Sequence, residues 1–144
     1  MSERAPGVRD FAQRVGATLA GLFVGMAVNM TIIQGSMALH GAPADLDWNN
    51  AEAVATYIGS MPWTAFVLAM IAHLAQAFCG GWVAARLTPS RPMASAMIIG
   101  TLSALGGIAS MQTIPHPWWM WIELPLYFVV AWGAGRLEQQ RRDG

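Results

Sequence analysis

Four long apolar runs constrain the fold of this 144-residue chain more than any other feature. They cover residues 15–39, 61–87, 92–114 and 118–137. A helix rises about 1.5 Å per residue, so each run is long enough to cross a hydrocarbon core of about 30 Å. Charged residues make up only 11% of the chain, against about 25% in a typical soluble domain. We therefore predict an all-α integral membrane bundle of four transmembrane helices, with residues 1–144 forming a single membrane domain.

The arginines predict how these spans are oriented. All eight basic residues are arginines, and the connections at 40–60 and 115–117 carry none of them. Cytoplasmic segments of membrane proteins are enriched in basic residues, so the arginine-bearing ends are expected in the cytoplasm together with both termini. The arginines form three clusters: Arg4, Arg9 and Arg14; Arg86 and Arg91; and Arg136, Arg141 and Arg142.

Tryptophans agree with this orientation. Indole rings prefer the interface between membrane and water, and five tryptophans fall near the predicted outer ends of the spans. These are Trp48, Trp63, Trp118, Trp119 and Trp121.

The connection at 40–60 predicts a short helix over residues 49–59. The run Gly41-Ala42-Pro43 ends the first span, and either Asp47 or Asn49 can cap a new helix. Apolar residues then recur at helical spacing, which fits an amphipathic helix lying on the outer surface. A plain capped loop helix has the same signature, so both interpretations stay open. The recurring residues are Ala51, Val54, Ala55 and Ile58.

The second and fourth spans resemble each other. Residues 71–87 align without gaps on residues 121–137, and both segments contain the pattern Trp-x-Ala-x-Arg-Leu, beginning at Trp82 and Trp132. The first and third spans match more weakly, with Gly25 falling on Gly106. We therefore predict that the bundle is built from two similar helical hairpins with the same orientation in the membrane.

The repeat predicts a polar layer inside the membrane. It aligns His73 with Glu123, and each lies thirteen residues before the arginine at the cytoplasmic end of its span. This spacing corresponds to about 20 Å, in the outer half of the bilayer. Asn29 lies at a similar level, and Ser110 is its partner in the repeat. Asn29, His73, Ser110 and Glu123 are the candidate site residues.

Small residues predict that this layer faces the interior of the bundle. Asn29, His73 and Ser110 are flanked at helical spacing by mostly small residues, which allow close approach of helices in lipid, and we place all four polar residues inside the bundle. The pair Gly21-x-x-x-Gly25 can serve packing within one chain or contact with a second copy, and we favour the first. The flanking residues are Gly21, Gly25 and Ser36; Gln76, Ala77, Gly80 and Ala84; and Ala96, Gly100, Ser103 and Gly107.

Glu123 is the costly member of the layer. An ionised group at mid-membrane costs about 3 kcal/mol on insertion scales, and Glu123 avoids this cost by protonation or by pairing with His73. Such a pair can relay protons or sense pH. The alternative is that the layer only hydrogen-bonds the hairpins together, although such contacts contribute only about 0.6 kcal/mol on average. The sequence leaves both interpretations open.

Other chemistry has little support in the sequence. It shows no catalytic triad, phosphate-binding loop or carboxylate pair, so we expect no enzyme activity and no cofactor. The absence of a basic stripe argues against nucleic-acid binding. A metal site using His116, His73 and Glu123 is a lesser hypothesis, because no ligand spacing supports it.

Several short segments resemble a group of small, functionally uncharacterised four-helix bacterial inner-membrane proteins. They are Ala53-Val54-Ala55-Thr56-Tyr57-Ile58 leading to Pro62, Phe78 with Gly80-Gly81, Gly106-Gly107, and Ile114-Pro115-His116-Pro117. The resemblance implies a four-helix bundle in the inner membrane and implies no activity. The chain does not resemble four-helix multidrug exporters, because its first span carries no acidic residue, and it lacks a fluoride-channel pattern.

The sequence therefore supports two functional hypotheses from different classes. The first is a small transporter or channel that uses the pair of His73 and Glu123, either as a single chain or as a homo-oligomer. The second is an accessory or structural subunit of a larger membrane complex. A membrane metal-binding protein is a third, lesser hypothesis.

Overall fold

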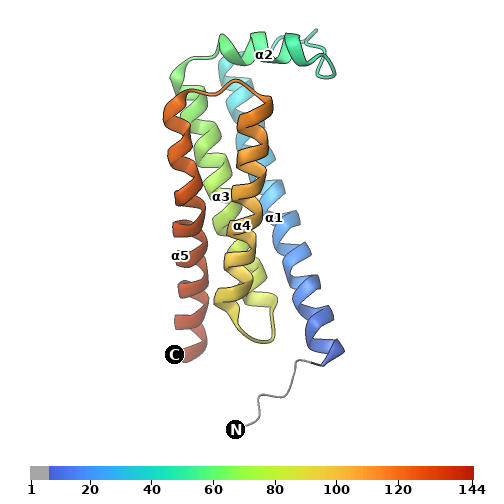
Figure 1. The fold of residues 1–144 in the computed structure, drawn as a ribbon, viewed down its shortest axis with the longest axis vertical. Helices are drawn as coiled ribbons and strands as arrows, with labels where there is room; N and C mark the ends of the chain where they lie inside the picture. The colour runs from blue at the N-terminus through green and yellow to red at the C-terminus, as the bar shows by residue number, and fades with distance from the viewer. Residues whose placement is uncertain (1–6) are drawn as a thin grey trace.

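The computed structural model describes residues 7–144, which are almost entirely helical (Figure 1). The helices α1, α3, α4 and α5 run alongside one another, and α2 lies across one end of them (Figure 1). We call this end the α2 end; α1 begins and α5 finishes at the opposite end, the terminal end. The elements are α1 (Val8–His40), α2 (Ala51–Gly59), α3 (Trp63–Leu87), α4 (Pro92–Thr113), the 3₁₀ segment η1 (Trp118–Ile122) and α5 (Glu123–Asp143). The predicted all-α fold is confirmed.

Three helices, α1, α3 and α4, are long and apolar enough to cross a membrane. They match the predicted spans at 15–39, 61–87 and 92–114. Helix α1 begins earlier than predicted, at Val8, because the apolar run marks only the part of a helix that suits lipid. Its polar first turn includes Asp10, and an acidic residue there is favoured by the helix dipole. Arg4 lies outside the described residues.

The predicted fourth span, 118–137, is not one regular helix. It is divided between η1 and α5, and α5 continues past Leu137 to Asp143. Pro125 explains the division, because proline has no N–H to donate to the carbonyl of Trp121 and is tolerated only in the first turn of a helix. Since α5 ends in a charged segment, it does not join the three helices whose length and hydropathy suit a membrane span.

Helix α2 forms where residues 49–59 predicted a helix, but with a different cap. The side chain of Asn50 accepts hydrogen bonds from the backbone N–H groups of Glu52 and Ala53. The prediction of Asp47 or Asn49 was therefore wrong. Asp47 instead accepts a hydrogen bond from the N–H of Asn49, which closes the turn just before the helix.

Glycine contacts hold α1 against α3. A Cβ atom on Gly21 would lie 2.5 Å from the carbonyl oxygen of Gly80, and one on Gly25 would lie 2.7 Å from that of Gln76. Only glycine permits backbones to approach this closely. Gly21 and Gly25 therefore pack within one chain, as the sequence analysis favoured.

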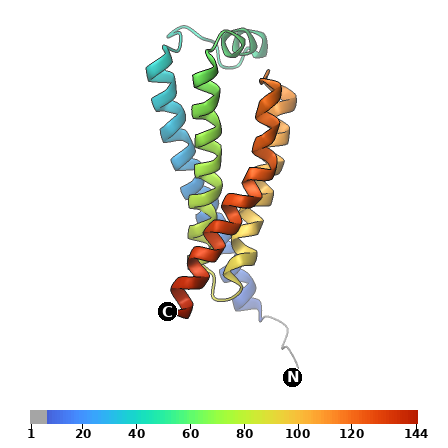
Figure 2. The same ribbon diagram turned by 90° about the vertical axis from the view of Figure 1, so that its left-hand side faces the viewer.

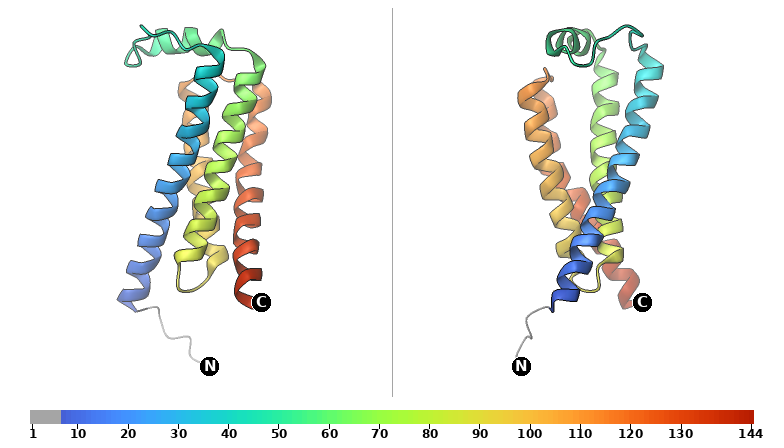
Figure 3. Two further views of the ribbon diagram at one scale, coloured as in Figure 1. Left: turned by 180° about the vertical axis from the view of Figure 1, so that it is seen from behind. Right: turned by 90° about the vertical axis from the view of Figure 1, so that its right-hand side faces the viewer.

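The four long helices diverge toward the α2 end. Figure 2 and the right-hand view of Figure 3 show α1 and α3 drawing apart from α4 there, while the helices come together near the terminal end. The close glycine contacts lie in the converging part; for example, Gly81 lies against Ala96 and Ala134. The side chains between the diverging helices form the candidate site.

Candidate functional site

His73 and Glu123 are joined by a hydrogen bond between α3 and α5. Nδ1 of His73 lies 2.7 Å from Oε1 of Glu123, a distance typical of a charge-assisted bond. The Glu123 residue is fully buried, whereas 25% of the His73 side chain is exposed. The contact predicted from the repeat is therefore present, and the imidazole lies between the carboxyl group and the more accessible space.

Tyr127 completes the surroundings of the carboxyl group. Its hydroxyl donates a hydrogen bond to Oε1 of Glu123, the same oxygen that faces His73. The other oxygen, Oε2, is buried and has no hydrogen-bond partner among the described residues. Tyr127 was not among the predicted site residues, although residues four apart on a helix lie on the same face. That spacing from Glu123 was the signal that could have found it.

Glu123 lies where η1 passes directly into α5. It is the first residue of α5, and its backbone N–H donates hydrogen bonds to the carbonyl oxygens of Met120 and Trp121 in η1. The repeat placed Glu123 in the middle of one long helix, whereas the structure places it at the junction of these two helical segments.

Three of the four predicted polar residues line one cavity of about 230 Å³, here called the lower cavity. They are Asn29 from α1, His73 from α3 and Ser110 from α4, and Tyr127 from α5 joins them. Asn29 is buried, with 8% of the residue exposed. Within the described residues, neither Asn29 nor Ser110 bonds directly to the pair of His73 and Glu123. The predicted layer is thus assembled around a cavity with His73 as its link to Glu123.

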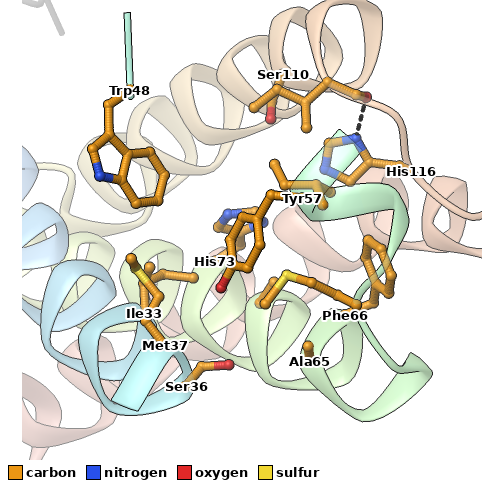
Figure 4. A pocket seen from close by; sticks show the side chains of 14 residues that line it. Ile33, Ser36, Met37, Trp48, Tyr57, Ala65, Phe66, His73, Ser110 and His116 are labelled. Carbon is orange, nitrogen blue, oxygen red and sulfur yellow. Dashed lines mark hydrogen bonds between the residues drawn. The ribbon is translucent and has the colours of Figure 1, made fainter. Parts of the chain in front are cut away.

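A second cavity, of about 270 Å³, lies between His73 and α2 and is called the upper cavity. His73 and Ser110 line both cavities. Figure 4 shows the upper cavity surrounded by side chains from α1, α2, α3 and α4. The residues that line it include Ile33, Ser36, Met37, Trp48, Tyr57, Phe66, Ser110 and His116. The imidazole of His73 can therefore exchange a proton with the cavity on the α2 side.

The pair can hold one proton in two places. It is either a carboxylate with an imidazolium, or a carboxylic acid with a neutral imidazole, and the two forms differ by one transfer along the 2.7 Å line between Nδ1 and Oε1. The second ring nitrogen, Nε2, remains available to exchange a proton with a cavity. A carboxyl group bonded to an imidazole whose second nitrogen is free is the smallest arrangement that can relay a proton.

His116 lies at the edge of the upper cavity and is fixed by its own backbone. Its Nδ1 donates a hydrogen bond of 2.6 Å to the carbonyl oxygen of Ile114, and its ring meets Phe66 edge to face. Across residues 7–144, no group of three or more His, Cys, Asp and Glu side chains is arranged to hold a metal ion. These residues therefore contain no set of ligands that would support the hypothesis of a metal site.

A second polar cluster at the terminal end was not predicted. Glu138 is fully buried and accepts hydrogen bonds from Arg141, at 2.6 and 2.8 Å, and from Arg142, at 2.9 Å. Arg86 lies 3.9 Å away. We call these four residues the Glu138 cluster. Arg141 and Arg142 were predicted only to mark the cytoplasmic end, although their spacing of three and four from Glu138 indicates side-chain pairing on a helix.

The Glu138 cluster ties α5 to the end of α3. Arg142 donates hydrogen bonds to the carbonyl oxygens of Ala85, at 2.7 Å, and Thr88, at 2.9 Å. These carbonyls lie at the C-terminal end of a helix, where arginine is a favourable partner. Nearby, Arg14 of α1 donates to the hydroxyl of Ser90 at 2.7 Å. The terminal end is thus closed by polar contacts as well as by glycine packing.

Comparisons with protein-family models, with curated proteins and with solved structures give no match to this chain. The function must therefore be inferred from the chemistry of the site.

Proposed function

We propose that this chain is a small transporter or channel of the bacterial inner membrane that moves protons through the pair of His73 and Glu123. In this proposal α1, α3, α4 and residues 118–137 cross the membrane, as two similar hairpins. The terminal end, which carries the arginines, faces the cytoplasm, and the α2 end faces outward.

One observation carries the proposal. A fully buried carboxyl group is bonded to an imidazole that lines cavities on both of its sides. A polar group that served only to join helices would gain little from this access. Intramembrane acidic and histidine side chains in the interior of a bundle are characteristic of proton pathways.

The difference between the two ends of the bundle supports access of protons to His73 from the outer side. The upper cavity extends from His73 to α2, whereas the terminal end is held by glycine contacts and by the Glu138 cluster. Protons from the outer water would thus reach Nε2 of His73 before the buried carboxyl group. Passage to the cytoplasm requires the lower cavity to open between α1, α3 and α4.

The test is proton flux into liposomes that contain the purified protein and a pH-sensitive dye. A pH gradient is imposed, with potassium and valinomycin to balance charge. We expect the wild type to dissipate the gradient faster than protein-free liposomes, and Glu123→Gln to lose most of this flux. Glu52→Gln, which removes an exposed carboxyl group on α2, is the matched control and keeps it.

Two results would contradict the proposal. One is a Glu123→Gln protein that folds and conducts like the wild type. The other is wild-type protein that gives no flux above protein-free liposomes, in which case the chain is better described as an accessory or structural subunit of a larger membrane complex.

A further inference from the structure

Three aromatic side chains contribute to the walls of the upper cavity, among mostly aliphatic ones. Trp48, Tyr57 and Phe66 all line it. The ring of Trp48 packs edge to face against that of Tyr57 beside the cavity, with centroids 6.3 Å apart. The faces of aromatic rings carry partial negative charge and attract cations.

The free ring nitrogens of the two imidazoles at this cavity are acceptors when the imidazoles are neutral. His116 uses its Nδ1 hydrogen on the carbonyl of Ile114, which leaves Nε2 with a lone pair. His73 has Nδ1 against Glu123, which leaves its Nε2 toward the cavities. Among the described residues, no arginine lines the cavity, and the chain contains no lysine. An anion would therefore find no fixed positive charge.

We propose that the upper cavity binds a lipophilic organic monocation, an aromatic or quaternary amine, and that Glu123 supplies the counter-charge through His73. This inference rests on the proposed function and names the substrate class of the same site. A cavity of about 150 Å³ accommodates benzene, so the 270 Å³ of this one suits a molecule with one ring and a compact charged head.

Binding of the cation would be coupled to release of one proton. When the pair consists of imidazolium and carboxylate, the site is neutral overall, and the positive charge of His73 repels an organic cation. Loss of the proton from His73 to the outer water leaves the charge of Glu123 uncompensated, and the incoming cation replaces it. The other titratable side chains around the pair and the cavity are Tyr127 on α5, Tyr57 on α2 and His116 in the turn before η1. Binding should therefore weaken as the pH falls.

The experiment measures binding of three probes of similar shape to purified protein in mild detergent by calorimetry. They are benzyltrimethylammonium, the neutral N-benzylacetamide and the anionic phenylmethanesulfonate. We expect the cation to bind about tenfold or more tightly than either of the others, with about one proton released per cation when buffers of different ionisation enthalpy are compared. Equal affinity for all three probes would overturn the proposal, and it would do so with wild-type protein alone.

Variants locate the site. We expect Glu123→Gln to weaken cation binding about tenfold or more and Tyr57→Leu to weaken it about fivefold, the value of one cation–π contact. Glu52→Gln, with the same change in net charge, should stay within about twofold of the wild type, because exposed charges are largely screened. Cation binding that survives in Glu123→Gln, or that is lost equally in Glu52→Gln, contradicts the assignment.

The two proposals can fail separately. Calorimetry in detergent needs no transmembrane flux, and proton flux in liposomes needs no organic cation. Flux without selective cation binding would leave the proposed function intact and remove the substrate class. Selective binding without flux would remove the transport proposal and with it the coupling to protons across the membrane.

Discussion

The proposed function depends on Glu123 more than on any other residue. It is fully buried, yet it receives hydrogen bonds from His73 and Tyr127 at a single oxygen. Burial of a charge is costly unless it is paired and hydrogen-bonded. The position is thus suited to a group that gains and loses a charge.

Glu138 is a buried acid of a different kind. Hydrogen bonds and charge from Arg141, and to a smaller extent from Arg142, lower the pKa of Glu138 from its ordinary 4.5 to about 2, although burial acts in the opposite direction. The same pairing raises the pKa of Arg141. Glu138 therefore stays ionised in the folded protein at any physiological pH and acts as a fixed anchor.

This difference predicts a pH dependence of stability. Because the pKa of Glu138 is lower in the folded than in the unfolded chain, its stabilisation is complete above pH 4.5 and is lost as the pH falls from 4.5 to about 2. Glu138→Gln should lose about 2 kcal/mol at neutral pH and show a flatter profile below pH 4.5. Thermal unfolding in detergent measures both effects.

The control for this prediction is Asp45→Asn, which removes an exposed carboxyl group from the loop before α2. It should keep the wild-type profile. A Glu138→Gln protein whose stability falls with acid as steeply as that of the wild type would show that the cluster is not the source of the effect.

At the scale of elements, the packing of α1 on α3 depends on two glycines. The backbone oxygen of Gly80 occupies the space that a Cβ on Gly21 would need, and a backbone atom cannot rotate away as a flexible side chain can. Small residues at helix interfaces are the main source of close packing in lipid.

We expect Gly21→Ala to destabilise the protein by about 1–3 kcal/mol, the usual cost of overpacking. Gly16→Ala lies on the same helix, where a Cβ would meet no atom within 4 Å. It should be neutral or stabilising by up to about 1 kcal/mol. Unfolding in mixed micelles compares the two variants directly, and equal stabilities would contradict the packing described for α1 and α3.

The elements also show how far the sequence determines the structure. Apolar length located α1, α3 and α4, and small residues at spacing four indicated the buried faces, since Ala96, Gly100 and the other flanking residues of α4 are buried. The repeated tryptophan and arginine make similar contacts in both copies, with Arg86 5.7 Å from the ring of Trp82 and Arg136 5.9 Å from that of Trp132. The twofold arrangement of whole hairpins remains a prediction.

Other features could not be predicted, for physical reasons. The division of residues 118–137 depends on a single missing N–H at Pro125. The contact of His73 with Glu123 was predicted from alignment, whereas Tyr127 breaks the repeat and so was not found. The cavities depend on the angle between helices, which no local pattern encodes.

At the scale of the whole molecule, the helices diverge at one end and are held together at the other. The diverging end contains the upper cavity beneath α2, and the converging end contains the glycine contacts and the Glu138 cluster. The exposed surface of the long helices is largely apolar, with side chains such as Phe23, Leu105 and Val129. Water is therefore expected to enter from the α2 end and not through the sides.

The central claim is that outer water reaches the space beside His73 within the membrane. In a Cys79→Ser background, Ser110→Cys places a thiol at both cavities, and Leu105→Cys places one on the exposed apolar face of the same helix. We predict that a charged, membrane-impermeant thiol reagent added outside intact cells modifies the cysteine at 110 and leaves that at 105 unmodified. Protection of both, or equal modification of both, would contradict the claim.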